Sequence, residues 1–281
     1  IQLGDWSSDV CSSDLGKRIK EIWENKWLTN HGPLEQELQL KLKKFLGVKN
    51  IELFANGHIS LELAIKTLNL TGEIITTPFT FASTTQSIIN NGLTPVYADI
   101  DEEYYNLNPD NIEELITDKT TAIMPVHVFG NPCEVEKIDK IAKKYDLNVI
   151  YDAAHAFNVS INEIPIGNYG DLSMFSFHAT KVFNTVEGGA LVFENDDFNY
   201  RLKSIKNFGI TPDTEEVQFL GQNGKMNEFE AAMGIVNLEN VENAISKRKQ
   251  LYEKYLESLS YLENNSKVKV IRPKDNVDYN Y

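Results

Sequence analysis

The sequence predicts an α/β fold in which a mainly parallel β-sheet lies between helices. Segments of strand character alternate with segments of helical periodicity from about residue 51 to residue 206, a pattern typical of such sheets. The strand segments are nearly continuous apolar runs, as expected for parallel strands that are covered on both faces. At 281 residues, the chain is long enough for one large α/β domain and part of a second.

Strands are expected where short apolar runs stop at polar residues. The run 51–54 is followed by Asn56, and the run 148–151 is followed by Asp152. Ligands of parallel sheets bind beyond the carboxyl ends of the strands, so we expect one cleft to hold Asn56, Asp152 and Lys181. The expected strands are residues 51–54, 74–75, 95–98, 121–126, 148–151, 172–177, 190–193 and 268–271.

Helices are expected where apolar residues recur at every third or fourth position. Leu34, Leu38 and Leu42 follow this spacing, and Gly47 is a typical residue for the end of such a helix. A turn with glycine before a helix also gathers backbone N–H groups that bind phosphate. The expected helices lie within residues 17–46, with a break at 28–33, from about residue 59, and at 79–89, 110–116, 135–145, 197–206 and 226–255, whereas 209–224 is expected to be a loop.

The sequence is predicted to consist of three parts. Residues 1–15 are rich in Ser and Asp and lack either structural period, so we interpret them as a non-native or disordered leader outside the fold. Residues 16–240 form the large α/β domain. Residues 241–281 are expected to hold a linking helix and the beginning of a small C-terminal domain, truncated at Tyr281.

The composition excludes several classes of partner. There are 41 acidic and 27 basic residues, for a net charge of −14, which argues against nucleic acid and anionic membrane surfaces. No apolar run is long enough to span a bilayer. Cys11 and Cys133 are the two cysteines and form neither a disulfide framework nor a metal cluster. A cytoplasmic location is therefore expected.

A single lysine directly follows the apolar segment 172–177. Burial disfavours the charged ammonium form of lysine, and the chemistry that uses the neutral amine is Schiff-base formation. The alternative is that Lys181 is solvated and has no catalytic role. A P-loop and a GxGxxG fingerprint are both absent from the sequence, so nucleoside triphosphates and dinucleotides are not predicted ligands.

Asp152 and His155 follow another buried segment. An ionised Asp152 would pair with a cation deep in the cleft; the alternative is a residue that caps the next helix. The alternative for His155 is a half-buried imidazole with satisfied hydrogen bonds. No other His or Cys stands at metal-ligand spacing from His155, so a metal site is not predicted.

Eight short motifs occur in a fixed order along the sequence. They are residues 28–33 (LTNHGP), 56–57, 76–81 (TTPFTF), 125–127, 152–156, 176–181 (SFHATK), 187–189 and 221–228. Each is weak alone, but the ordered set resembles the DegT/StrS family of pyridoxal-phosphate-dependent sugar aminotransferases, from about residue 23 to the last residues. The resemblance implies the fold of aspartate aminotransferase (fold type I), with a seven-stranded, mainly parallel sheet.

The resemblance implies roles around the ring of pyridoxal 5′-phosphate. Lys181 would form a Schiff base with the cofactor and later move a proton. Asp152 would pair with the pyridinium nitrogen, since an ionised carboxylate keeps that nitrogen protonated. His155 would contact the phenolic oxygen, and Phe81 would stack on the ring face.

The resemblance also implies a set of phosphate contacts. Ser176 would bond the phosphate, and Gly57 and His58 would offer backbone N–H groups. Asn223 would reach the phosphate in the neighbouring subunit, so a homodimer is expected. The family often has threonine or serine where His58 stands, which leaves the role of the imidazole there open.

The implied function is transfer of an amino group from L-glutamate to C4 of a nucleotide-linked 4-keto-6-deoxy-hexose, for surface polysaccharide or O-antigen synthesis. Resemblance is strongest to the subgroup that makes dTDP-4-amino-4,6-dideoxyglucose, which shares Lys225 where many members have arginine. One alternative is an aminotransferase acting at C3, or a 4-keto sugar dehydratase, although dehydratases replace the lysine with histidine. Another is a truncated pseudo-enzyme that binds cofactor without turnover.

Overall fold

The computed structural model describes residues 12–265 and 268–281, and its centre is a seven-stranded sheet. The strand order is β1-β9-β8-β5-β4-β2-β3. The strands are β1 (Asn50–Phe54), β2 (Glu73–Thr76), β3 (Thr94–Tyr97), β4 (Thr120–Ile123), β5 (Asn148–Asp152), β8 (Leu172–Ser176) and β9 (Gly189–Phe193). A second sheet has the order β10-β6-β7, with β6 (Ser160–Ile161), β7 (Ile164–Pro165) and β10 (Val277–Asp278).

All strands of the large sheet are parallel except β9. The pairs β8/β5, β5/β4, β4/β2 and β2/β3 are parallel, whereas β9 runs antiparallel to both of its neighbours, β1 and β8. Consequently, the carboxyl ends of β1, β5 and β8 share one edge of the sheet, and the turns that follow them lie together there. The predicted fold class, with a mainly parallel sheet of seven strands, is confirmed.

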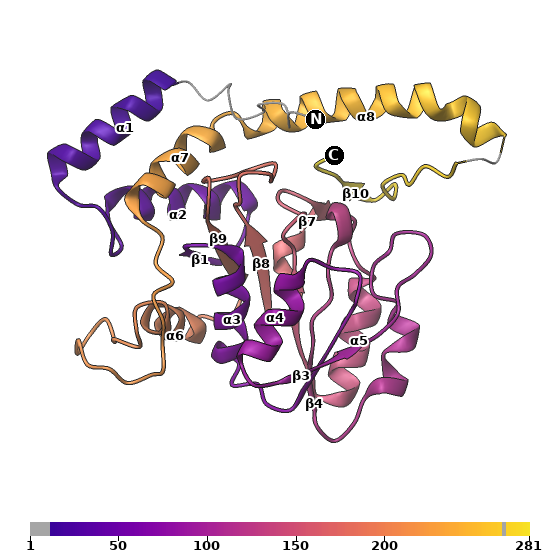
Figure 1. The fold of residues 1–281 in the computed structure, drawn as a ribbon, viewed down its shortest axis with the longest axis horizontal. Coiled ribbons are helices and arrows are strands. Elements are labelled where there is room, and N and C mark those ends of the chain that lie inside the picture. Colours follow the sequence, from indigo (N-terminus) through magenta and orange to yellow (C-terminus); the bar gives the residue numbers. More distant parts are fainter. Residues whose placement is uncertain (1–11, 266–267) are drawn as a thin grey trace.

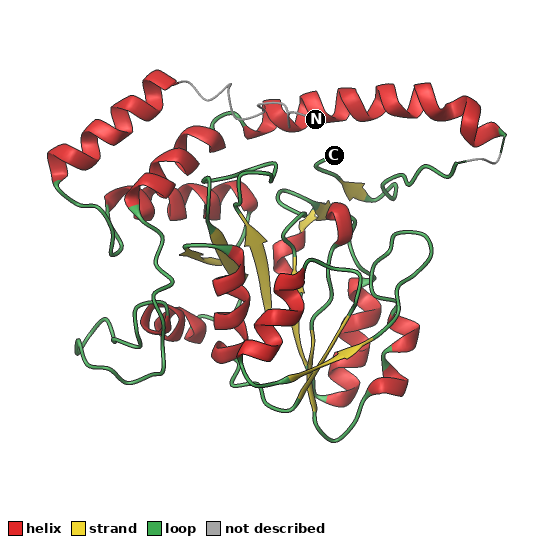
Figure 2. Ribbon diagram, viewed as in Figure 1, coloured by secondary structure: helices red, strands yellow, loops and turns green. Residues whose placement is uncertain are grey.

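Helices cover the sheet on both sides (Figures 1 and 2). In Figure 1, α3 and α4 lie side by side in front of the sheet, and the long α8 runs along one side of the molecule above the C-terminal segment. The α-helices are α1 (Ser12–Asn25), α2 (Pro33–Leu46), α3 (Gly57–Thr67), α4 (Ala82–Asn90), α5 (Val135–Tyr145), α6 (Asp197–Ile205), α7 (Glu228–Leu238) and α8 (Val241–Asn264). Short 3₁₀ turns lie at Pro109–Asn111, Glu113–Leu115, Val128–Gly130 and Ile166–Asn168.

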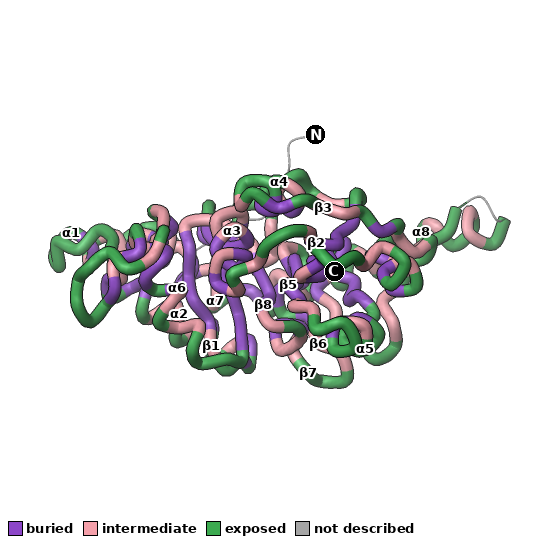
Figure 3. The backbone as a smooth tube through the Cα atoms, turned by 90° about the horizontal axis from the view of Figure 1, so that it is seen from below, coloured by how far each residue is buried: buried purple, intermediate pink, exposed green. Residues whose placement is uncertain are grey.

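The core follows the central strands. Figure 3 shows buried backbone concentrated in the middle of the molecule and exposed backbone along much of α1 and at the far end of α8. The strands β5, β8 and β9 are buried almost throughout, as expected for strands with helices on both faces. None of the helices that the structure describes is both long and apolar enough to cross a membrane.

A buried ion cluster joins three of these elements. Lys206, directly after α6, forms ion pairs with Glu35 of α2, at 3.1 Å, and with Glu52 of β1. Burial by itself lowers the pKa of the Lys206 ammonium, but the charges of Glu52 and Glu35 outweigh it and hold that pKa above its ordinary value. Because unpaired buried charges are costly, the cluster favours one arrangement of α2, β1 and α6.

The first turn after β1 packs against the first residue of β9. A Cβ atom on Gly189 would lie 2.6 Å from the carbonyl carbon of Asn56 and 2.6 Å from the amide nitrogen of Gly57. Both are backbone atoms, so no rotamer change can make room for a larger residue at Gly189. The close approach therefore requires glycine and fixes the turn that precedes α3.

We expect Gly189→Ala to lower the free energy of unfolding by about 1–3 kcal/mol, the usual cost of overpacking. The measurement is urea unfolding followed by circular dichroism. Gly16→Ala is the control, because a Cβ at Gly16 would meet nothing within 4 Å. In the helix α1 this change should raise stability by about 0.5–1 kcal/mol. Equal stability of Gly189→Ala and the unchanged protein would contradict the close approach.

Three predicted elements differ in the structure. The single helix expected at 226–255 is two helices, because the helix breaks at residues 239–240, where the Asn240 amide bonds the Val236 carbonyl. Residues 110–116 form 3₁₀ turns rather than a helix. Residues 268–271 are not a strand, and the Val270 N–H is bonded to the Glu263 carboxylate instead of a neighbouring strand.

The two ends of the sequence also differ from expectation. Helix α1 begins at Ser12, so residues 12–15 of the predicted leader are helical, whereas residues 1–11, with Cys11, lie outside the described residues. At the other end, β10 pairs with β6, which belongs to the predicted large α/β domain. The segment after α8 thus packs directly against the α/β domain, and the division into two domains stays a prediction.

Candidate active site

A cavity of about 1040 Å³ lies at the carboxyl edge of the large sheet. Seven of the eight predicted site residues line it: Gly57, His58, Phe81, Asp152, His155, Ser176 and Lys181. They come from the ends of β5 and β8, from the N-termini of α3 and α4, and from the loops after β5 and β8. The expected cleft with Asn56, Asp152 and Lys181 is thereby found, since Asn56 lines it too.

Asp152 is the last residue of β5 and lies at the bottom of this cavity. The residue is only 3% exposed, and its carboxylate accepts hydrogen bonds from the Thr84 hydroxyl, at 2.7 Å, and from the Ala154 N–H, at 3.1 Å. Burial raises the pKa of Asp152, while these two hydrogen bonds and the charge of Lys181 act in the opposite direction. A cation placed against Asp152 would therefore stabilise its ionised form.

Lys181 stands on the loop that follows β8. Its backbone N–H bonds the His178 carbonyl at 2.9 Å, which closes a turn and directs the backbone toward the sheet edge. Burial lowers the pKa of the Lys181 amine, and the charge of Asp152 partly offsets this. A lowered pKa increases the fraction of neutral, nucleophilic amine. The structure thus brings the predicted amine and carboxylate into one cavity.

His155 lies between Lys181 and an aromatic ring. Burial, with the charge of Lys181 as a second cause, lowers the pKa of His155 to about 4. The imidazole is therefore neutral near pH 7 and offers one N–H donor. The Phe129 ring is nearly parallel to it, with centroids 6.2 Å apart. Phe129 itself has a φ of 54°, a conformation uncommon for a residue other than glycine.

The turn from β1 to α3 presents the N-terminus of a helix to the cavity. Gly57 and His58 are the first two residues of α3, so the helix offers no carbonyl to their N–H groups. A Cβ on Gly57 would lie 3.2 Å from the Ser176 Cβ, which shows how closely this turn faces Ser176. The Asn56 amide oxygen caps the helix by accepting from Ile59 N. Such a helix N-terminus favours a phosphate.

The imidazole of His58 is held away from this cradle. Its Nδ1 is 2.8 Å from the Ser83 hydroxyl and its Nε2 is 3.3 Å from a Glu62 carboxylate oxygen. These contacts hold the imidazole between α3 and α4. At the helix end His58 therefore offers its backbone N–H, and its role toward a phosphate stays a prediction.

Phe81 is the residue before α4, lines the cavity and is 80% exposed. An aromatic ring this exposed has room for a flat ligand against one face. Thr84, three positions later on the same helix, bonds Asp152. Thr84 was not predicted as a site residue. Its position three residues after Phe81 could have pointed to it, because residues three apart at a helix start share a face.

Asn223 does not line this cavity. It lies in the exposed loop before α7, where its amide oxygen accepts a hydrogen bond from Lys225 at 2.8 Å. The structure therefore does not bring Asn223 to the other predicted residues of the same subunit. A role toward a neighbouring subunit, as implied for the family, stays a prediction.

Fold and cavity together define a class: an α/β protein that holds one amine and one buried carboxylate near a phosphate-type cradle at the carboxyl edge of its sheet. A model of the DegT/DnrJ/EryC1/StrS aminotransferase family matches residues 11–281. The chain belongs to this family.

Relatives of known name support the same assignment. The chain is 48% identical over 230 residues to a dTDP-4-amino-4,6-dideoxy-D-glucose transaminase from Shigella dysenteriae, and 47% identical over 234 residues to one from Escherichia coli. Each match covers 82% of this sequence and 62% of the relative. The chain therefore spans 62% of the length of these curated relatives.

A solved structure, that of DesI in the presence of its TDP-sugar product, is similar throughout the fold. Its TM-score is 0.84 at 35% identity, and the match covers 88% of this sequence and 63% of DesI. The crystal structure of a family member from Brucella abortus has a TM-score of 0.90 at 24% identity and covers 100% of this sequence and 76% of that protein. This second likeness concerns the fold alone.

Proposed function

We propose that this protein acts as a pyridoxal-phosphate-dependent aminotransferase that moves an amino group from L-glutamate to C4 of a nucleotide-linked 4-keto-6-deoxy-hexose, with dTDP-4-dehydro-6-deoxy-D-glucose as the substrate. The observation that carries the proposal is the shared cavity of Lys181 and Asp152. The named relatives support the substrate. Surface polysaccharide or O-antigen synthesis in the cytoplasm is the proposed setting.

The residues present fit pyridoxal phosphate. The cradle at Gly57, which has no room for a Cβ without crowding Ser176, suits the phosphate. Asp152 is a buried carboxylate whose pKa burial has raised, and a pyridinium N–H is the type of cation that would restore its charge. The exposed ring of Phe81 suits the ring face. When bound, pyridoxal phosphate supplies an electron sink for the transfer of the amino group.

The protein's own residues then have separate tasks. Lys181 would hold the cofactor through its Nζ atom and would move a proton at that same Nζ. Asp152 would pair with the ring nitrogen, whose positive charge favours the ionised carboxylate, and Thr84 orients Asp152 through its hydroxyl. His155, neutral because burial lowers its pKa to about 4, holds an N–H toward the cavity without adding charge.

The test of this function uses glutamate without sugar. Protein loaded with pyridoxal phosphate should change its visible absorbance when L-glutamate is added, and a later addition of dTDP-4-dehydro-6-deoxy-D-glucose should restore it. Nuclear magnetic resonance of the product then identifies C3 or C4 as the aminated carbon. A spectrum that glutamate leaves unchanged contradicts the aminotransferase and favours the cofactor-binding pseudo-enzyme.

The C4 assignment has a specific basis. The two relatives named for the 4-amino sugar are 48% and 47% identical, whereas a dTDP-3-amino-3,6-dideoxy-alpha-D-galactopyranose transaminase from Aneurinibacillus thermoaerophilus is 32% identical. Lys181 is present in this sequence, which argues against a dehydratase. Amination at C4 is therefore preferred to the alternatives.

A homodimer with shared sites is also proposed. Asn223 is exposed and lies outside the cavity of its own subunit. Large apolar residues are exposed in the same part of the molecule, among them Phe208, Leu220 and Phe229. Such residues are typical of a surface that another protein covers, and a second copy would place Asn223 at a neighbouring phosphate cradle.

Mixing two inactive variants tests this arrangement. Asn223→Ala and Lys181→Ala should each be impaired alone. If Asn223 serves the neighbouring subunit, mixed dimers hold one intact site, so an equal mixture should regain about one quarter of the unchanged activity after subunit exchange. Light scattering measures the mass of the assembly. A mixture with no recovered activity, despite formation of mixed dimers, contradicts the shared site.

A further inference from the structure

Two neighbouring helices, α3 and α4, start at the large cavity. Gly57 and His58 are the first residues of α3, and Phe81 directly precedes α4; all three residues line the cavity. In the proposed function, the cofactor phosphate lies at the start of α3 and the cofactor ring lies against Phe81. The relative position of the two helix starts therefore decides whether phosphate and ring are both held in the productive place.

The imidazole of His58 links these two helix starts. Its Nδ1 is 2.8 Å from the hydroxyl of Ser83, in the first turn of α4, and its Nε2 is 3.3 Å from a carboxylate oxygen of Glu62, one turn further along α3. The negative charge of Glu62 favours a proton on the nitrogen that faces it. Nε2 therefore donates to Glu62, and Nδ1 accepts from the Ser83 hydroxyl.

Glu62 is a fixed partner for this imidazole. The Glu62 side chain is only 14% exposed. Its carboxylate also accepts hydrogen bonds from the side-chain amide of Asn90, the last residue of α4, at 2.7 Å, and from that of Gln222, in the loop before α7, at 2.9 Å. The His58 ring is thus restrained at both nitrogens, and one of its two partners is itself held from two other elements.

Ser83 lies between the two residues of this helix start that serve the cofactor ring. Phe81, two positions earlier, lines the cavity, and Thr84, the next residue, donates to the Asp152 carboxylate at 2.7 Å. The hydrogen bond between Ser83 and His58 therefore acts on the same helical turn that orients Asp152. A shift of this turn would change how the ring meets the carboxylate.

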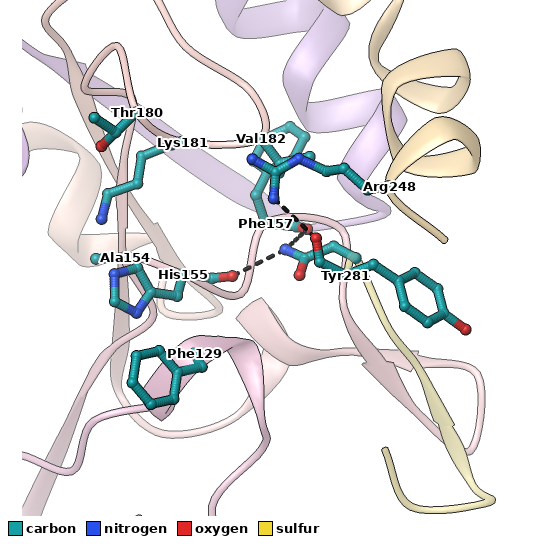
Figure 4. A pocket seen from close by; sticks show the side chains of 10 residues that line it. Phe129, Ala154, His155, Phe157, Thr180, Lys181, Val182, Arg248 and Tyr281 are labelled. Atoms are coloured by element: carbon teal, nitrogen blue, oxygen red, sulfur yellow. Dashed lines mark hydrogen bonds between the residues drawn. The ribbon is translucent and has the colours of Figure 1, made fainter. Parts of the chain in front are cut away.

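The amine of the site is placed by other elements. Figure 4 shows the Lys181 side chain directed toward the His155 imidazole, and these residues stand on the loops that follow β8 and β5. Both loops start from the sheet and not from α3 or α4. When the link between the two helices is lost, the amine is therefore expected to remain reactive while the ring loses part of its orientation.

We propose that His58 is a positioning residue, whose imidazole holds the first turn of α4 against that of α3 and thereby orients the cofactor ring at Asp152. The inference rests on the proposed function, since it takes pyridoxal phosphate as the ligand of the cavity. The phosphate itself would meet backbone N–H groups at the start of α3, which a change of side chain leaves in place. The loss in a His58 variant should therefore concern the ring and not the phosphate.

Pyridoxal and pyridoxal phosphate separate these two contributions, because both have the ring and the aldehyde but only one has the phosphate. The amplitude of the visible band gives an apparent Kd for each compound, after subtraction of the signal of Lys181→Ala. In His58→Ala both Kd values should rise by the same factor, about 3- to 10-fold, as expected for the loss of one hydrogen bond. A rise for pyridoxal phosphate alone would mean that the imidazole binds the phosphate, and it overturns the proposal.

The pH midpoint of the visible band is a readout that a general loss of stability does not move. A protonated ring nitrogen disfavours a second positive charge at the bond to Lys181, which keeps this midpoint low. A ring that meets Asp152 less well holds that proton less firmly, so the midpoint should rise in His58→Ala. An unchanged midpoint in a variant with weakened binding would contradict a role in orienting the ring.

Ser83→Ala tests whether the effect passes through α4. It should raise both Kd values about as much as His58→Ala does. The double variant should bind no more weakly than either single variant, because both changes remove the same hydrogen bond. Factors that multiply in the double variant would show that the two side chains act independently, which contradicts the proposal.

Two further variants cover the case in which His58→Ala does not fold. His58→Asn keeps an acceptor close to the position of Nδ1 and should bind both compounds within about twofold of the unchanged protein. His58→Gln reaches toward Glu62 but lacks that acceptor, and its Kd values should rise as in His58→Ala. Equal Kd values for folded His58→Asn and His58→Gln, judged by circular dichroism, overturn the proposal.

Tyr200→Phe is the matched control. It also removes one hydrogen bond, that from the Tyr200 hydroxyl to Asp213 at 2.7 Å, but neither residue lines the cavity. It should bind both compounds as the unchanged protein does. The proposed function is judged separately by adding L-glutamate: a band that depends on His58 but does not respond to glutamate refutes the aminotransferase and leaves the positioning role standing.

Discussion

Lys181→Ala is expected to lower the rate of amino transfer by about 10⁴-fold or more, because it removes both the attachment point of the cofactor and the group that moves the proton. The variant should also lack the visible absorbance band that pyridoxal phosphate acquires when it is bound to an amine of the protein. Absorbance titration with pyridoxal phosphate measures the second effect independently of turnover.

Lys140→Ala is the matched control, because Lys140 is exposed on α5 and does not line the cavity. It should form the band and react with glutamate normally. If Lys181→Ala formed the same band with the same stoichiometry as the unchanged protein, another lysine would hold the cofactor and the assignment would be wrong.

The pH dependence of cofactor attachment tests the same amine. Burial lowers the pKa of Lys181, with Asp152 acting against it, and the neutral amine is the reactive form. The rate of band formation should therefore rise with pH and level off above a midpoint that lies below the ordinary lysine value of 10.5. Removing the charge of Asp152 should move this midpoint further down, since that charge favours the ammonium form.

Asp152→Asn should lower the rate of amino transfer by about 10²–10³-fold, a loss typical of removing one fixed electrostatic contact from a site. The amide has the shape of the carboxylate but no charge, so it cannot keep the ring nitrogen protonated. One of its ends would also present N–H₂ where Asp152 now accepts from Thr84 or Ala154. Stopped-flow absorbance after addition of glutamate measures the rate.

Asp171→Asn separates this effect from a loss of strand geometry. Asp171 accepts from Val149 N at 2.8 Å, at the opposite end of β5. The Asp171→Asn variant should be less stable than the unchanged protein, but its rate of amino transfer with cofactor bound should be the same. A rate in Asp152→Asn within about threefold of the unchanged protein, with the cofactor bound, would mean that the charge at this position has no catalytic role.

Much of the fold was predictable because its strands have strong local signals. Segments such as 148–151 are short, apolar and followed by a polar residue, and they became strands within a residue or two of the expected ends. Prediction failed where the decisive contact is distant or comes from a polar group outside the backbone. The alternation at 268–271 resembles a strand, yet strand formation needs a neighbour, and Val270 bonds Glu263 instead.

The same distinction between local signals and distant contacts applies to the candidate site. Lys181, Asp152 and Gly57 follow strand ends, so the rule for parallel sheets gathers them without any knowledge of their individual contacts. Asn280 had no such signal. It is 4% exposed, and its amide donates to the carbonyls of His155 and Phe157, both at 2.9 Å. Nothing in the local sequence of Asn280 points to residues more than a hundred positions earlier.

This contact sets an order of events during synthesis on the ribosome. Asn280 is 125 positions after His155, and Tyr279, whose hydroxyl bonds the Phe129 carbonyl, is 150 positions after Phe129. Protein emerges from the ribosome N-terminal part first, so a nascent polypeptide that has exposed β5 and the loop after β8 already has its lysine and carboxylate. The loop that holds His155 is anchored only after residue 280 has left the exit tunnel, so the site is completed well after its lysine and carboxylate have emerged.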